Sequence, residues 1–249
     1  MNILICGVGG RMGREVARLA LDGMRGANVV AGYDILPVDT GEFPTYTDWN
    51  AVTEDVDCIV DFSHHSGTEA LLRFATERRI PIVLATTGHT EAELATVAAA
   101  AQEIPIFHSA NMSLGIALLV ELAKITAKTF PDADIEIIEK HHNRKLDAPS
   151  GTALLLANAI REIRERATLV FGRGGQAKRT SEEIGIHAVR MGNVIGEHEV
   201  IVGTDTQTVT LKHEAHSRAL FAEGALAAAE FLIGKPAGMY DMKKMIDNE

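Results

Sequence analysis

The segment ILICGVGGRMGREV, residues 3–16, decides the fold of the amino-terminal half of the chain. It joins a short apolar run to an amphipathic helix through the glycines Gly7, Gly9, Gly10 and Gly13. Glycines let the backbone turn tightly between a strand and a helix, and they leave room for a pyrophosphate beside the unpaired amides of the helix. The segment therefore predicts a dinucleotide-binding loop, and a plain turn without a ligand is the alternative.

The next strand along the chain bears on the choice of dinucleotide. Asp34 ends an apolar run, 28–33, about 20 residues after the glycines, as the dinucleotide-binding pattern requires. A carboxylate there accepts a hydrogen bond from the ribose 2'-hydroxyl and repels a 2'-phosphate. Ile35 follows, so no adjacent cation favours that phosphate, although Arg11 could reach it. NADH is favoured, and NADPH stays open.

The first two-thirds of the chain alternates apolar runs with segments of helical spacing. Strands are expected at 3–6, 28–33, 57–62, 81–85 and 105–108, and helices at 11–24, 68–78 and 91–102. Apolar runs without polar alternation fit parallel strands buried on both faces. We expect an α/β domain with a Rossmann-like, doubly wound parallel sheet.

After Asn111 the rhythm changes. Helices are expected at 114–130, 152–165 and 219–232, and strands at 134–140, 184–191, 197–203 and 206–213. Short strands separated by glycine, asparagine and aspartate suggest antiparallel meander pairing. This part predicts a second domain of α+β type with a mixed or antiparallel sheet.

Composition excludes several classes of protein. The 249 residues are 46% hydrophobic and 23% charged, with a net charge of -10 and no block of consecutive basic residues. A nucleic-acid-binding surface would need clustered lysine and arginine. The chain shows no signal peptide and no apolar stretch of the ~20 residues that a membrane span needs, so a cytoplasmic location is expected. Cys6 and Cys58 lie in apolar runs and are expected to be buried thiols, with no metal site.

The segment HHNRKLDAPSGTA, residues 141–153, concentrates reactive side chains. His141 and His142 leave a strand, and Lys145 follows in a polar loop. A helix then begins at Ser150, Gly151 and Thr152. Hydroxyls, free amides and the positive end of a helix suit a carboxylate, and imidazoles that titrate near neutral pH can donate a proton as hydride arrives.

Each of these features also has a plain structural explanation. Ser150 is a good helix N-cap in its own right, and an isolated histidine pair or loop lysine is more often solvated surface. Their concentration in about a dozen residues, in a chain that carries a dinucleotide loop, keeps the functional interpretation open beside the structural one.

The same segment closely resembles the signature of the 4-hydroxy-tetrahydrodipicolinate reductase family, also called dihydrodipicolinate reductases. The likeness extends over essentially the whole chain. It includes GVGGRMG at 7–13, DFS at 61–63, TTG at 86–88, SANMSLG at 109–115, GR at 172–173, EIGIHAVR at 183–190, GEH at 196–198 and the close FAEGALAAAEFLIGKPAGMYDM at 221–242.

The resemblance implies an NAD(P)H-dependent oxidoreductase of the diaminopimelate route to lysine, which adds hydride to the substrate ring. It implies that His141 is the general acid and that Lys145 anchors a substrate carboxylate. The implied ligands of the dicarboxylate substrate are His142, Ser150, Gly151 and Thr152. The implied cofactor-binding residues are Gly7, Gly10, Arg11, Met12, Gly13, Asp34, Phe62, Ser63, Ala85, Thr87, Ala110 and Met112.

The resemblance also implies a discontinuous organisation. A dinucleotide-binding domain would comprise 1–111 and 220–249, and a substrate-binding and oligomerisation domain 112–219, with a homotetramer formed through the sheet of the second domain. Ala85 and His64-His65 depart from the family pattern near the expected nicotinamide wall.

Two other functions remain to be weighed. One is a related two-domain reductase of another small anionic substrate. The other is a non-catalytic dinucleotide sensor, which would bind cofactor without turnover and would not need His141 or Lys145.

Overall fold

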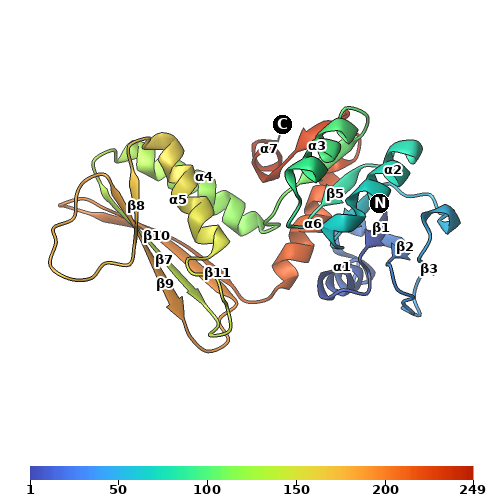
Figure 1. The fold of residues 1–249 in the computed structure, drawn as a ribbon, viewed down its shortest axis with the longest axis horizontal. Helices are drawn as coiled ribbons and strands as arrows, with labels where there is room; N and C mark the ends of the chain where they lie inside the picture. Colours follow the sequence, from blue (N-terminus) through green and yellow to red (C-terminus); the bar gives the residue numbers. More distant parts are fainter. Residues whose placement is uncertain (249) are drawn as a thin grey trace. The chain divides into compact units, whose positions relative to one another are not determined.

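The computed structural model describes residues 1–248, which form two compact units (Figure 1). The first unit comprises Met1–Ser113 together with the chain from Ala219 onward, and the second comprises Leu114–Arg218. The first is built on a parallel sheet and the second on a mixed sheet. The fold class expected from the sequence is confirmed.

The sheet of the first unit has the strand order β12-β6-β5-β4-β1-β2-β3, and its neighbouring strands are parallel. Its strands are β1 (Asn2–Cys6), β2 (Asn28–Tyr33), β3 (Thr45–Tyr46), β4 (Cys58–Asp61), β5 (Ile82–Leu84), β6 (Pro105–His108) and β12 (Gly238–Tyr240). The chain order reverses beside β1, and in open α/β sheets ligands bind at such a switch point, beyond the carboxyl ends of the strands.

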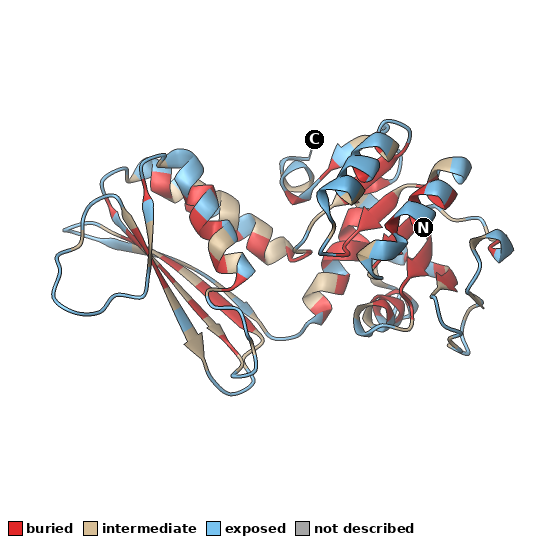
Figure 2. Cartoon of the chain, in the orientation of Figure 1, coloured by how far each residue is buried: buried red, intermediate tan, exposed pale blue. Residues whose placement is uncertain are grey.

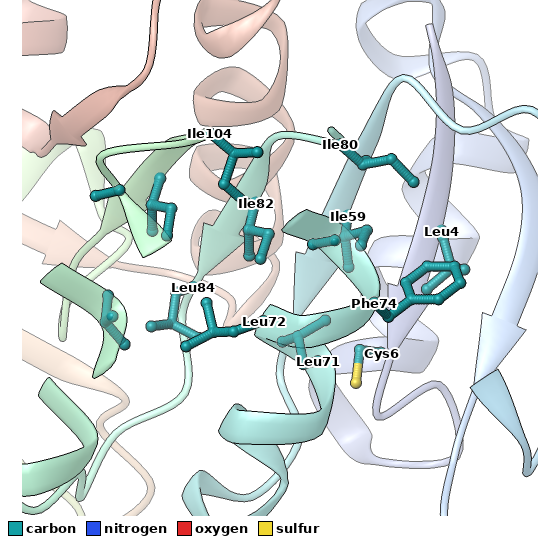
Figure 3. Close-up of a cluster of buried hydrophobic side chains, with 14 of the residues drawn as sticks. Leu4, Cys6, Ile59, Leu71, Leu72, Phe74, Ile80, Ile82, Leu84 and Ile104 are labelled. Atoms are coloured by element: carbon teal, nitrogen blue, oxygen red, sulfur yellow. The ribbon is translucent and has the colours of Figure 1, made fainter. Parts of the chain in front are cut away.

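Helices cover both faces of this sheet. They are α1 (Arg11–Leu21), α2 (Thr68–Arg78), α3 (Glu91–Ala100) and α6 (Ala219–Leu232), and a short α7 (Met242–Asp247) follows β12. Buried apolar side chains of β1, β4 and β5 pack against α2, with Leu4, Ile59, Leu71 and Ile82 among them (Figure 3). Because these strands are apolar on both faces, their central position is the one that removes most apolar surface from water.

Helix α6 returns to the first unit after the second has been completed. Its buried side is rich in alanine and includes Gly224, and these small residues let the helix backbone come close to its neighbours. A Cβ at Gly224 would overlap the carbonyl oxygen of Met112. The two segments that border the second unit are therefore packed directly against each other within the first.

The second unit has the strand order β11-β10-β7-β9-β8. Its strands are β7 (Asp134–His141), β8 (Thr168–Phe171), β9 (Glu183–Arg190), β10 (Gly196–Gly203) and β11 (Thr208–Ala215). Its helices are α4 (Leu114–Thr129) and α5 (Gly151–Ile163). Along β7 buried residues alternate with partly exposed ones (Figure 2), since Ile135 and Ile137 belong to the core that α4 and α5 share with the sheet.

The pairing in this sheet corrects the expectation of an antiparallel meander. Strands β10 and β11 do form an antiparallel pair. Strand β9, however, is parallel to both β7 and β8, and β10 pairs with the other edge of β7. Proximity along the chain favoured a β9–β10 hairpin, whereas the sheet has β7 in the middle, with β9 on one side and β10 on the other. The short strands β3, β8 and β12 and helix α7 were also missed.

Two further expectations concern cysteines and membranes. Cys6 and Cys58 are buried free thiols, as expected. Among residues 1–248, no helix combines the length and the apolar character that crossing a bilayer demands.

Candidate active site

The glycine loop after β1 is closed by contacts that only glycine permits. Gly7 has a φ of 79°, and its amide donates to the carbonyl of Tyr33 at 2.8 Å. A Cβ at Gly13 would overlap the carbonyl oxygen of Gly7, so α1 begins directly against the loop. Gly10 is the N-cap of α1 and supplies no side chain to cap it. The first amides of α1, at Arg11 and Met12, therefore lack a side-chain cap and suit a pyrophosphate.

Asp34 lies beside this loop at the end of β2. Its Oδ2 accepts a hydrogen bond from the Gly9 amide at 2.9 Å, and Oδ1 accepts one from Leu36 at 3.4 Å. Ile35 next to it is 79% exposed. The carboxylate and the glycines that sequence reasoning paired are thus brought together, with an apolar residue where a cation would favour a 2'-phosphate.

The loops after β4 and β5 are tied to each other by a buried carboxylate. Asp61, at the end of β4, is 1% exposed, and its Oδ2 accepts from the hydroxyl of Thr86 at 2.6 Å. Its Oδ1 accepts from the Ser63 amide at 3.1 Å, and its carbonyl accepts from the Ala85 amide. A Cβ at Gly7 would lie 2.8 Å from the backbone of Phe62.

Three successive loops at the carboxyl edge of the sheet thus lie side by side in the first unit. They carry the predicted cofactor residues Phe62, Ser63, Ala85 and Thr87, of which Thr87 is exposed and Ala85 is buried. Ala110 is exposed and Met112 is buried, just after β6.

Four histidines lie at this edge, of which sequence analysis noted only His64 and His65, as departures from the family pattern. The rings of His64 and His65 lie 4.2 Å apart, and those of His89 and His108 lie 5.7 Å apart. His65 Nδ1 is 2.9 Å from Glu93, and the hydrogen bonds from His65 and Thr90 lower the pKa of Glu93 to about 2. Within residues 1–248, no group of three or more histidine, cysteine or acidic side chains is arranged to hold a metal ion.

In the second unit, His141 ends β7 with its side chain turned toward the buried face. Its Nδ1 lies 2.6 Å from Oε2 of Glu139, two residues earlier on the same face of the strand. Glu139 is 0% exposed, and it also accepts one hydrogen bond from each terminal nitrogen of Arg190, both at 2.7 Å. Burial by itself would raise the pKa of Glu139, but the hydrogen bonds from Arg190, His141 and the Ser150 amide outweigh it and lower that pKa.

Lys145 is connected to the same group of side chains. Its Nζ lies 2.8 Å from Asp147, whose carbonyl accepts a hydrogen bond from Arg190 at 2.6 Å. Since the lysine and Asp147 form a loop ion pair that is open to solvent, an incoming carboxylate can compete for the ammonium. Leu146 between them is 99% exposed.

Ser150 is fully engaged within the protein. Its hydroxyl accepts from the Ala153 amide at 3.2 Å and lies 3.0 Å from Nε2 of His198, while its own amide donates to Glu139 at 2.9 Å. The structural explanation of Ser150 as an N-cap therefore holds. Gly151 is exposed and Thr152 partly exposed at the start of α5, where the helix dipole favours an anion.

His142 and His198 are both disfavoured as cations. Burial, followed by Arg144 and Arg218, lowers the pKa of His142. Burial, followed by His141, lowers the pKa of His198 to about 4. The Nδ1 atoms of both rings are buried and have no hydrogen-bond partner among residues 1–248.

Sequence reasoning missed Glu139, Arg190 and His198 as functional candidates. Arg190 and His198 occur in motifs that carry the family resemblance, but nothing in those motifs assigns them a role. A signal for Glu139 was present, since a glutamate two residues before a strand-end histidine shares its face. Arg190 and His198 could be placed only with the strand register, which pairs His141 with Arg190 and Glu139 with His198.

Comparison with known proteins follows the same division of the chain. The family model for the amino-terminal part of dihydrodipicolinate reductase matches residues 1–112, and that for the carboxyl-terminal part matches 115–246. A curated 4-hydroxy-tetrahydrodipicolinate reductase of Caldanaerobacter subterraneus is 48% identical over 250 aligned positions, covering 99% of this chain and 98% of the relative. One of Clostridium tetani is 42% identical, covering 100% and 98%.

Solved structures agree with this fold. The dipicolinate-bound dihydrodipicolinate reductase from Paenisporosarcina sp. TG-14 superposes with a TM-score of 0.82 at 24% identity, covering 97% of each chain. An amine dehydrogenase from Mycobacterium smegmatis shares the fold less closely, with a TM-score of 0.66 at 12% identity over 98% of this chain and 95% of that one.

The relatives are named as reductases, and the alignments cover nearly the full length of both chains. Its activity is accordingly that of a 4-hydroxy-tetrahydrodipicolinate reductase, an NAD(P)H-dependent reduction in the diaminopimelate route to lysine. Neither a reductase of another small anion nor a non-catalytic sensor accounts for this match as well. The chain belongs to the 4-hydroxy-tetrahydrodipicolinate (dihydrodipicolinate) reductase family.

Proposed function

We propose that this chain reduces 4-hydroxy-tetrahydrodipicolinate with NADH as the preferred reductant, that His141 donates the proton and that Lys145 anchors a substrate carboxylate. The observation that carries the proposal is the second unit's combination of three features. They are a strand-end imidazole held by a buried carboxylate, an ammonium in a solvent-accessible ion pair, and the start of α5.

The glycine loop fits a dinucleotide because a Cβ at Gly7 would collide with the Phe62 backbone and one at Gly13 with the Gly7 carbonyl, so that only glycines let the loop turn this tightly before α1. Arg11 and Met12 would lie along the pyrophosphate, and Asp34 would accept the ribose hydroxyl. A bound nicotinamide would supply the hydride. Phe62, Ser63, Ala85, Thr87, Ala110 and Met112 would border it.

The substrate residues have separate tasks. Lys145 and the α5 amides of Gly151 and Thr152 would neutralise the dicarboxylate without a metal ion. Ser150 would act mainly through its backbone position, since its hydroxyl is occupied by Ala153 and His198. His142, whose pKa burial lowers, would contact substrate as a neutral ring.

Reduction of the 4-hydroxy substrate to tetrahydrodipicolinate releases the hydroxyl group as water. The proton donor acts after hydride has arrived. His141 would protonate the ring carbon next to the one that accepts hydride, through the nitrogen that Glu139 does not hold. Hydride transfer also requires the two ligands to meet within van der Waals distance. A homotetramer formed through the sheet of the second unit and a cytoplasmic location stay predictions.

The test is a turnover assay with freshly generated substrate and either NADH or NADPH, followed by nicotinamide absorbance. We expect His141→Ala to lower kcat by about 10³-fold with little change in KM, since a positioned general acid contributes roughly 10²–10⁴-fold. Lys145→Ala should lower kcat and raise KM. A His141→Ala enzyme with the kcat of the wild type would show that another group is the acid.

Binding of dipicolinate provides a second measurement that does not depend on turnover. Calorimetric titration should show weaker binding to Lys145→Ala and nearly unchanged binding to His141→Ala. Lys178→Ala, in the exposed loop 172–182, is a matched control that also removes one positive charge. A chain that binds NADH but turns over no substrate would support the sensor instead.

A further inference from the structure

We propose that Glu139 is the positioning residue of the site: one buried carboxylate fixes the imidazole of His141 and the start of α5 at the same time. The proposal rests on His141 as the acid of the reaction proposed above. It assigns to Glu139 no contact with substrate or cofactor.

The hydrogen bonds of Glu139 leave neither oxygen free. Oε2 accepts from His141 Nδ1 at 2.6 Å and from Arg190 Nη1 at 2.7 Å. Oε1 accepts from Arg190 Nη2 at 2.7 Å and from the Ser150 amide at 2.9 Å. Four bonds to three separate segments, β7, β9 and the N-cap of α5, hold the carboxylate in one orientation.

This arrangement decides which ring nitrogen exchanges a proton. An ionised carboxylate only accepts hydrogen bonds, so Nδ1 of His141 must carry a hydrogen. The proton that leaves the imidazolium is therefore the one on Nε2. A Cβ at Gly196 would lie 3.2 Å from Nε2, so the glycine of β10 keeps space in front of that nitrogen.

Arg190 compensates the buried negative charge of Glu139. A buried carboxylate without a partner would be strongly disfavoured, and the guanidinium neutralises it in a two-pronged pair. Titratable groups near His141 include His198 on β10 and the adjacent His142, and the Lys145–Asp147 ion pair lies in the loop that follows. Arg190 also donates to the carbonyl of Asp147. The loop that carries Lys145 is therefore held by the same Glu139–Arg190 ion pair.

The chain contains a comparison pair on the same strand. Glu136 lies 2.9 Å from Nε2 of His187 and pairs with Arg179, so it too has a histidine and an arginine as partners. It lies on the opposite face of β7, where it is partly exposed. Glu136 bonds Nε2 of His187, whereas Glu139 bonds Nδ1 of His141. The two rings should therefore carry opposite tautomers.

The first test measures those tautomers in the wild-type protein. Nitrogen-15 spectra of histidine-labelled protein, assigned with His141→Asn and His187→Asn, should show the Nδ1–H form for neutral His141 and the Nε2–H form for neutral His187. A neutral His141 with its hydrogen on Nε2, or averaged between both nitrogens, would overturn the proposal. This measurement needs no enzymatic activity.

The second test is kinetic. Glu139→Gln should lower kcat by about 10²-fold with KM changed less than about threefold, because the acid is misoriented while the carboxylate anchors remain. Glu136→Gln should leave kcat unchanged.

A merely structural role is separated by a double variant. Glu139→Gln leaves Arg190 without its partner, whereas Glu139→Gln with Arg190→Met removes both charges and restores a neutral interior. We expect the double variant to recover the thermal stability of the wild type but not its kcat. Recovery of both would show that Glu139 only maintains the fold.

The outcomes distinguish this proposal from the function on which it rests. Absence of reductase activity in the wild type would refute the proposed function, while the tautomer of His141 would still decide whether Glu139 holds the ring. Activity that survives His141→Ala would refute the acid assignment. A normal kcat in Glu139→Gln with a defective His141→Ala would refute only the positioning role.

Discussion

The two units form their candidate ligand sites from different chemical groups. In the first, the cradle consists of backbone amides and glycines between β1 and α1, and the Asp34 carboxylate accepts a hydrogen bond from the loop itself. In the second, the site consists of ionisable side chains, with His141, Glu139 and Arg190 brought together from two strands. One site is formed by a contiguous segment, and the other depends on strand register.

This difference determines how each site responds to substitutions and to pH. A cradle of backbone amides depends mainly on steric fit, because the amides themselves do not titrate. A network of buried charges depends on protonation and on every partner being present. The following predictions test this contrast, from the largest expected effect to the smallest.

The largest effect is expected on the stability of the second unit when the pH is lowered. Burial lowers the pKa of His198 to about 4, so the unfolded chain binds a proton more readily than the folded one between pH 6.5 and about 4. The contribution of His198 to stability should therefore fall as pH falls through that window, by about 3 kcal/mol, and this contribution should level off below it. Urea unfolding followed by circular dichroism at pH 7 and pH 4 measures this loss.

His198→Gln should remove that part of the pH dependence. The chain's single tryptophan, Trp49, lies in the first unit, stacked on Tyr33, and its fluorescence reports that unit separately. If the tryptophan transition showed the same loss and the same dependence on His198, the contrast between the units would be wrong.

The next effect is steric and belongs to the first unit. Gly13→Ala should lower the free energy of unfolding by about 2 kcal/mol, because the new methyl group must displace the Gly7 carbonyl. It should also weaken NADH binding at every pH. Tryptophan fluorescence in urea and calorimetric titration with NADH are the measurements.

Gly67→Ala is the matched control, since a Cβ there meets nothing within 4 Å and its φ of -86° suits alanine. It should change stability by less than about 0.5 kcal/mol. A Gly13→Ala protein as stable as this control, with normal NADH binding, would mean that the loop does not need its close contact.

The smallest effect concerns cofactor choice. Ile35→Arg places a cation beside Asp34 on an exposed position, and it should raise the kcat/KM ratio of NADPH to NADH by roughly tenfold, or about 1.4 kcal/mol. Ile35→Gln tests polarity without charge and should leave the ratio near that of the wild type. Equal ratios in the two variants would remove Asp34 and its neighbour as the determinants of preference.

Much of the first unit was predictable because its information is local. The bounds of α2 and β6 match the residue spacing directly, and the glycines mark the turn after β1. The strands β3 and β12 were missed, since two or three residues give too short a pattern to recognise.

The second unit was predictable in its parts but not in their pairing. The spacing gave helix α4 to within a residue of its end and placed His141 at the exit of a strand. A meander would have put β9 beside β10, and Arg190 would then have had no route to Glu139. Only the parallel register of β7 and β9 brings the guanidinium to the carboxylate.

By itself, the sequence determined the doubly wound sheet, the glycine loop with its carboxylate and the family to which the chain belongs, because each is written in contiguous residues or periodic patterns. The tertiary structure decided which side chains share the interior with His141. Glu139, Arg190 and His198 lie on three different strands, and a hydrogen bond acts only over about 3 Å, a distance that long-range strand pairing sets.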